Sequence, residues 1–185
     1  MQRIDADDMV EIRQRSEGRE PLIGWIAADS ATRLLIETIV DGAFHGWRII
    51  PTRDITHAER TGWTRLATRM LRGTRRAAPA GISAVLEMPW RTLLTTVEAH
   101  FGVVAITRTP DVNELFVGRA LRWKDDGLWI LTIDADGTID PQPFEVPFHR
   151  ITCVEFGSPY TAMYAGAVDW EAVLDAARDS STPRP

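Results

Sequence analysis

The feature that most constrains the fold of this chain is an internal repeat. When the sequence is aligned with itself at a shift of 94 positions, about thirty residues align without a gap. The matches include Glu20 with Glu114, Leu22-Ile23-Gly24 with Phe116-Val117-Gly118, and Leu34 and Ile36 with Leu128 and Ile130. After a two-residue insertion, Ile55-Thr56-x-x-Glu59 aligns with Ile151-Thr152-x-x-Glu155. The common register of these pairs predicts two copies of one structural unit.

Each copy has the pattern of five short strands, because segments rich in branched and aromatic residues alternate with turn formers. We expect strands at 9–15, 20–28, 33–40, 45–51 and 54–59, and again at 103–108, 114–123, 128–134, 143–148 and 150–156. Gly24 and Gly118 stand where glycine often marks the bend that closes a small barrel. The predicted fold class is mainly β with flanking α-helices, with two duplicated five-stranded barrels packed into one body.

Helical signals lie outside the repeats. Apolar residues recur at helical spacing after Pro89 until Gly102, Ser158-Pro159 is a cap followed by proline, and Asp169 caps a last helix. We therefore divide the chain into a first barrel, a helical connection, a second barrel, and C-terminal helices with a disordered tail. The corresponding ranges are 1–60, 61–102, 103–157 and 158–185.

Bent strands that close after an Ile-Thr-x-x-Glu segment resemble the Sm-like and SH3-like small barrels, over residues 9–59 and 103–156. The pattern is also similar to bacterial domains of unknown function. The RNA-binding signature of the Sm family ends in an Arg-Gly pair before the last strand. This chain has Arg53-Asp54 and His149-Arg150 there. The resemblance therefore implies the fold without the Sm RNA-binding pocket.

Composition indicates a globular protein, and the expected location is the cytoplasm. The 185 residues carry a net charge of −5 and a single cysteine, Cys153, in the apolar run ITCVEF. One cysteine excludes an intrachain disulfide, and we expect a buried structural thiol. The acidic balance disfavours a dedicated nucleic-acid binder.

The stretch from Arg60 to Arg76 contains six arginines and no acid. If it is helical, one face carries four of them and the opposite face carries Trp63, Leu66, Ala67 and Met70. The four are Arg65, Arg69, Arg72 and Arg76, and they are the candidate binding residues. Such a helix could bind phosphates, an acidic protein surface or an anionic membrane. Alternatively it covers the first barrel, with its apolar face buried and its arginines in solvent or paired with the acidic second half.

No catalytic, cofactor or metal motif is present. The loop Asp134-Ala135-Asp136-Gly137 lacks the later glutamate of a calcium-binding loop and is better explained as a hairpin turn. The four histidines show no metal-ligand spacing. Glu59 and Glu155 occupy matching positions, which fits either a carboxylate pair or equivalent structural roles. We therefore predict neither an enzyme, nor a cofactor, nor a metal.

The function that these observations favour is non-enzymatic binding of another protein. Small acidic proteins of this type include immunity and antitoxin partners. The alternatives are nucleic-acid binding through residues 60–76 and an enzyme with a site between the barrels. No membrane span is expected, and exposed strand edges make a homodimer conceivable.

Overall fold

The computed structural model describes residues 8–15, 20–111 and 113–180. Ten antiparallel strands form one continuous sheet in the order β5-β1-β2-β3-β4-β10-β6-β7-β8-β9. The first five are β1 (Met9–Gln14), β2 (Leu22–Asp29), β3 (Arg33–Val40), β4 (Ala43–Pro51) and β5 (Ile55–Glu59). The others are β6 (Val104–Arg108), β7 (Phe116–Trp123), β8 (Gly127–Thr132), β9 (Phe144–Pro147) and β10 (Ile151–Phe156). All ten expected strands are present, with ends shifted by a few residues at most.

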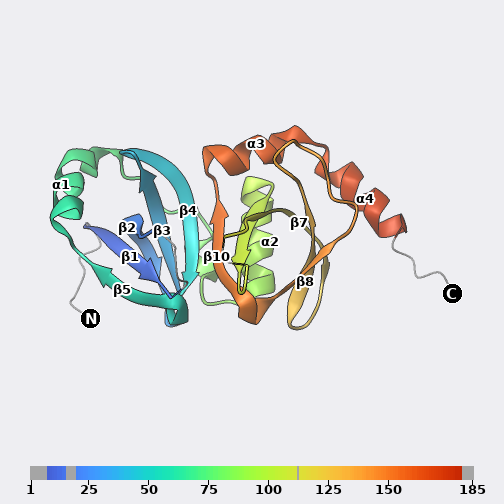
Figure 1. The fold of residues 1–185 in the computed structure, drawn as a ribbon, viewed down its shortest axis with the longest axis horizontal. Helices are drawn as coiled ribbons and strands as arrows, with labels where there is room; N and C mark the ends of the chain where they lie inside the picture. The colour runs from blue at the N-terminus through green and yellow to red at the C-terminus, as the bar shows by residue number, and fades with distance from the viewer. Residues whose placement is uncertain (1–7, 16–19, 112, 181–185) are drawn as a thin grey trace.

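The prediction of two closed barrels is wrong, because the sheet is open and runs through both halves (Figure 1). The junction is between β4 and β10, where Glu155 lies opposite Arg48 and Phe156 opposite Trp47. β10 is therefore a central strand, and all six of its residues are buried. β1 does not pair with β10 but contacts it through side chains: Gln14 Nε2 donates to the carbonyl of Thr152 at 3.1 Å, and Cys153 belongs to one buried cluster with Val10 and Ile12.

Equivalent strands of the two halves pair in the same register. Gly24 lies opposite Thr38 between β2 and β3, and Gly118 lies opposite Thr132 between β7 and β8. The register then shifts between Ile26 and Ala28 in the first pair and between Ala120 and Arg122 in the second. Each of these positions differs from its counterpart by the 94 residues of the sequence repeat.

Four α-helices flank the sheet. They are α1 (Gly62–Leu71), α2 (Trp90–Phe101), α3 (Pro159–Ala167) and α4 (Trp170–Ser180). The expected boundaries of α2 and the expected start of α3 are confirmed. Gly102 ends α2 with φ at 79°, and the side chain of Ser158 accepts the Thr161 N–H at the start of α3. Asp169 accepts from the Ala172 N–H at the start of α4. The predicted disordered tail lies outside the described residues from 181 onward.

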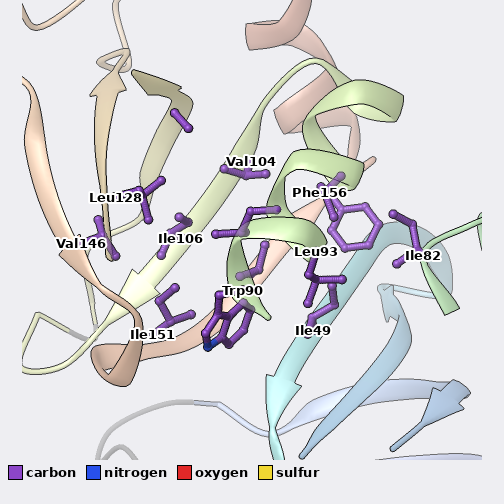
Figure 2. Close-up of a cluster of buried hydrophobic side chains, with 14 of the residues drawn as sticks. Ile49, Ile82, Trp90, Leu93, Val104, Ile106, Leu128, Val146, Ile151 and Phe156 are labelled. Carbon is purple, nitrogen blue, oxygen red and sulfur yellow. The ribbon is translucent and has the colours of Figure 1, made fainter. Parts of the chain in front are cut away.

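Helix α2 joins the two halves in one hydrophobic core (Figure 2). Its residues Leu93, Leu94 and Val97 are fully buried. They pack with Leu35, Trp47 and Ile49 of the first half, with Val104, Ile106, Leu128, Ile130 and Val146 of the second, and with Val154 and Phe156 of β10. The opposite face of the second half is covered by α3 and α4 through Tyr164, Trp170 and Leu174. No helix within the described residues is long and apolar enough to cross a bilayer.

Candidate binding cleft

A cleft of about 790 Å³ lies against the first half of the sheet, where α1 meets the loop before β7. Its lining comes from both halves of the chain, with β1 to β4 and α1 on one side and β6, β10 and residues 113–115 on the other. The volume is within the range of pockets that hold a small molecule or several side chains of a partner.

The cleft lies on the face of the sheet opposite α2. Val154 and Phe156 pack against α2, so Cys153 and Glu155 point to the other face. Arg48 likewise lies between Trp47 and Ile49, both of which face α2. In the second half this other face is covered by α3 and α4. In the part beside α1, no described helix covers this face in the same way, and the cleft lies there.

An ion pair lies at the inner wall of the cleft and joins the two halves. Arg48 Nη2 is 2.8 Å from Glu155 Oε2, and Arg48 Nε donates to the same oxygen at 3.0 Å. The Glu155 side chain is only 6% exposed. Thr38 is satisfied internally, since its hydroxyl donates to the carbonyl of Gly46 at 2.9 Å. The polar groups at the wall are therefore mostly paired, and the free surface of the cleft is largely apolar.

Helix α1 turns three of the four residues of its predicted apolar face outward, and only Ala67 is buried as the covering-helix alternative expected. Thr64, Ala67 and Thr68 face the sheet, and Thr68 Oγ1 accepts the Met9 N–H of β1 at 3.0 Å. These small residues let the helix approach β1 closely. As a result Trp63 is 54% exposed, Leu66 41% and Met70 70%. Trp63 and Met70 line the cleft.

The four candidate arginines do not share one helical face. α1 ends at Leu71, so only Arg65 and Arg69 belong to it, and Arg72 opens a short 3₁₀ turn. Arg76 lies beyond the turn, with its guanidinium 3.9 Å from the centre of the Phe44 ring. All four are exposed, and none lines the cleft. The helix ends early because Gly73 disfavours helix and Thr74 Oγ1 donates to the Leu71 carbonyl at 2.8 Å.

Three carboxylates stand at the rim of the cleft. Glu20 precedes β2, Asp41 is in the turn between β3 and β4, and Glu114 precedes β7. Each of the three is exposed. The sequence comparison aligned Glu20 with Glu114 but gave no reason to place them at one site. The fold brings these two aligned positions to the same opening.

The described residues of the cleft form no catalytic arrangement that the sequence had suggested. Cys153 is at its wall, but its thiol is buried, with 4% of the residue exposed. Glu59 and Glu155 do not pair with each other, since Glu59 lies on β5 beside His57 while Glu155 binds Arg48. Residues 134–137 form a turn closed by the Gly137 N–H and the Asp134 carbonyl. Within the described ranges, no group of three or more potential metal ligands is assembled.

Comparison with known proteins found no relative of this chain. No protein-family model matches the chain, and neither a curated protein nor a solved structure is significantly similar to it.

Proposed function

We propose that this chain is a non-enzymatic binding protein whose cleft receives part of another protein. The observation that carries the proposal is the outward apolar side of α1 at the mouth of a cavity of about 790 Å³. Exposed large apolar residues that adjoin one another mark interaction sites on soluble proteins. Trp63 and Met70 are suited to this role, because aromatic and methionine side chains are enriched at interface cores.

Binding is tested with two glutamates placed at the mouth of the cleft. Trp63→Glu combined with Met70→Glu puts charge on an apolar contact surface while leaving the buried face of α1 intact. We expect an unchanged circular dichroism spectrum and the loss of at least one protein that the wild-type chain captures from extract of its native host. Met163→Glu is the matched control, because Met163 is 57% exposed on α3, away from the cleft. Equal capture by all three proteins would contradict the proposal.

The alternative of nucleic-acid binding has weaker support in the geometry. Arg65 and Arg69 are on α1, but the early end of the helix separates them from Arg72 and Arg76. Fluorescence anisotropy with mixed-sequence RNA and DNA separates the two functions. Saturable binding that weakens with salt and is lost in Arg65→Glu with Arg69→Glu would favour nucleic acid. An enzyme with a site between the halves has no constellation of residues in its favour.

We also infer that the two halves descend from one duplicated unit. In both halves the strands are ordered fifth, first, second, third and fourth, and the β2–β3 and β7–β8 pairs share one register shift. This shared irregularity supports common descent more strongly than regular pairing does, because bulges are retained within families. A duplication also accounts for rim carboxylates at two aligned positions, Glu20 and Glu114.

A further inference from the structure

The charges that line the cleft are unbalanced. Its described lining holds four carboxylates, Glu20, Asp41, Glu114 and Glu155, and one guanidinium, Arg48. The guanidinium is bound to Glu155 at the inner wall. The three rim carboxylates are left, and within the described residues their side chains make no ion pair or hydrogen bond. Among the residues that the structure describes, the lining of the cleft therefore carries an excess of negative charge.

Exposed apolar side chains line the same cleft as these carboxylates. Met70 and Trp63 of α1, Val40 at the end of β3 and Leu115 before β7 are 70%, 54%, 46% and 40% exposed, and all four line the cleft. The exposed apolar surface also continues along α1 to Leu66, which lies outside the lining. An extended chain covers this surface more completely than a compact small molecule does.

From this charge pattern we infer that the occupant of the cleft is a basic segment of another protein, with apolar side chains flanked by lysine or arginine. The inference rests on the proposed function and specifies the chemistry of the partner. The apolar side chains enter the cleft, while the cationic groups face Glu20, Asp41 and Glu114. Trp63 adds a second attraction, since an indole ring binds ammonium and guanidinium groups over its face. Complementary charge at the rim increases the association rate and selects against acidic partners.

The test is selection from a displayed library of random peptides of about twelve residues, which span roughly 40 Å when extended. The wild-type chain and the Trp63→Glu/Met70→Glu variant are used as targets. We expect the wild-type chain to select peptides enriched in lysine and arginine next to apolar residues, and the variant to lose them. Labelled copies of the selected peptides are then titrated by fluorescence anisotropy.

A charge variant and its control decide the role of the rim. Glu20→Gln/Asp41→Asn/Glu114→Gln removes the three rim charges. Asp29→Asn/Asp125→Asn/Asp126→Asn makes the same change in net charge at exposed positions outside the cleft. We expect the rim variant to bind the selected peptides about ten-fold more weakly at low salt, with a smaller difference at high salt. The control should bind like the wild-type chain.

The outcomes distinguish a failure of the basic-partner inference from a failure of the proposed binding function. Selected peptides that are neutral or acidic, yet depend on Trp63 and Met70, would overturn the basic partner and leave the binding cleft standing. Equal weakening in the rim variant and its control would likewise overturn a specific role for the rim. If no selected peptide depends on Trp63 and Met70, both proposals are wrong.

Discussion

Glycine is required at positions 24 and 118 because a neighbouring strand approaches closely, and not because of an unusual φ. A Cβ atom on Gly24 would lie 1.9 Å from the carbonyl oxygen of Glu37, and one on Gly118 would lie 1.8 Å from that of Leu131. Because the blocking atoms are backbone, the strands would have to separate to accept a side chain. The sequence prediction that these glycines mark a bend in the second strand is consistent with this contact.

We therefore expect Gly24→Ala and Gly118→Ala each to lower the free energy of unfolding by about 3 kcal/mol, a cost typical of overpacking. The measurement is urea denaturation followed by circular dichroism. Gly166→Ala on α3 is the control, since a Cβ there meets no atom within 4 Å. It should leave the free energy of unfolding unchanged or raise it by up to about 1 kcal/mol. Strand variants as stable as the control would contradict the close approach.

Glu98 of α2 is a residue whose ionisation opposes folding. Its carboxylate accepts the Ala120 N–H at 2.7 Å, but burial dominates and raises the pKa of Glu98 to about 7 from 4.5. Between these two values the unfolded chain loses its proton more readily than the folded protein does. Stability is therefore retained at low pH and falls as pH rises through this window.

For the wild-type chain, the contribution of Glu98 to this loss is about 1 to 3 kcal/mol, because the side chain keeps some contact with water. Glu98→Gln keeps an acceptor for the Ala120 N–H and removes the titrating group. We expect the free energy of unfolding of the variant to rise relative to that of the wild type when the pH is raised from 5 to 8. Urea unfolding at both pH values measures this difference. If the difference between the two proteins does not change with pH, the assignment to Glu98 is wrong.

At the scale of elements, the β4–β10 junction contains the ion pair that most directly connects the halves. Arg48 is 22% exposed and Glu155 6%, so removing the arginine leaves a nearly buried carboxylate without its partner. Arg48→Met should lower the free energy of unfolding by about 3 kcal/mol, and adding Glu155→Met should recover much of that loss. A double-mutant cycle by urea denaturation measures the coupling. Additive effects of the two changes would mean that the pair contributes nothing across the junction.

The strands could be predicted from the sequence, but their joining could not. Local alternation and turn residues locate each strand, whereas the β4–β10 pairing depends on contacts between residues about 100 positions apart. One signal was present in the two segments that the sequence alignment matched as fifth strands. ITCVEF is apolar nearly throughout and is buried on β10, while ITHAE has polar residues and forms the edge strand β5. Their different polarity separates a central strand from an edge strand.

The candidate site was harder to predict, because burial on α1 does not follow hydrophobicity. The helical pattern placed Trp63, Leu66, Ala67 and Met70 on one face, and an amphipathic helix normally buries such a face. Of these four residues only Ala67 is buried. Here small residues are buried instead, since Thr68 binds the backbone of β1 and Ala67 allows a close contact. The rest of the lining comes from strand ends and loops that only the fold brings together. Of the cleft residues, the sequence drew attention to Glu155, Cys153 and the pair Glu20 and Glu114, and to Trp63, Ala67 and Met70 only as a face expected to be buried or to accompany an arginine face.

At the scale of the whole molecule, α2 makes the two halves depend on one core. Helix residues Leu93 and Leu94 contact a cluster that includes Ile49 of the first half and Ile106 of the second (Figure 2). A second connection supports this. Arg33 of β3 donates to the carbonyls of Leu86 and Met88, both at 2.7 Å, and holds the segment before α2 against the first half. Loss of packing in one half would therefore expose core residues of the other half to water.

We accordingly expect a single unfolding transition, and Leu93→Ala should shift the whole of it. Removing a fully buried leucine leaves a cavity and lowers the free energy of unfolding by about 3 to 5 kcal/mol. Tryptophan fluorescence and far-ultraviolet circular dichroism should report the same midpoint in both proteins. Leu66→Ala, on the exposed side of α1, should change stability by less than about 1 kcal/mol. Two separate transitions, with only one moved by Leu93→Ala, would show that the halves fold independently despite the continuous sheet.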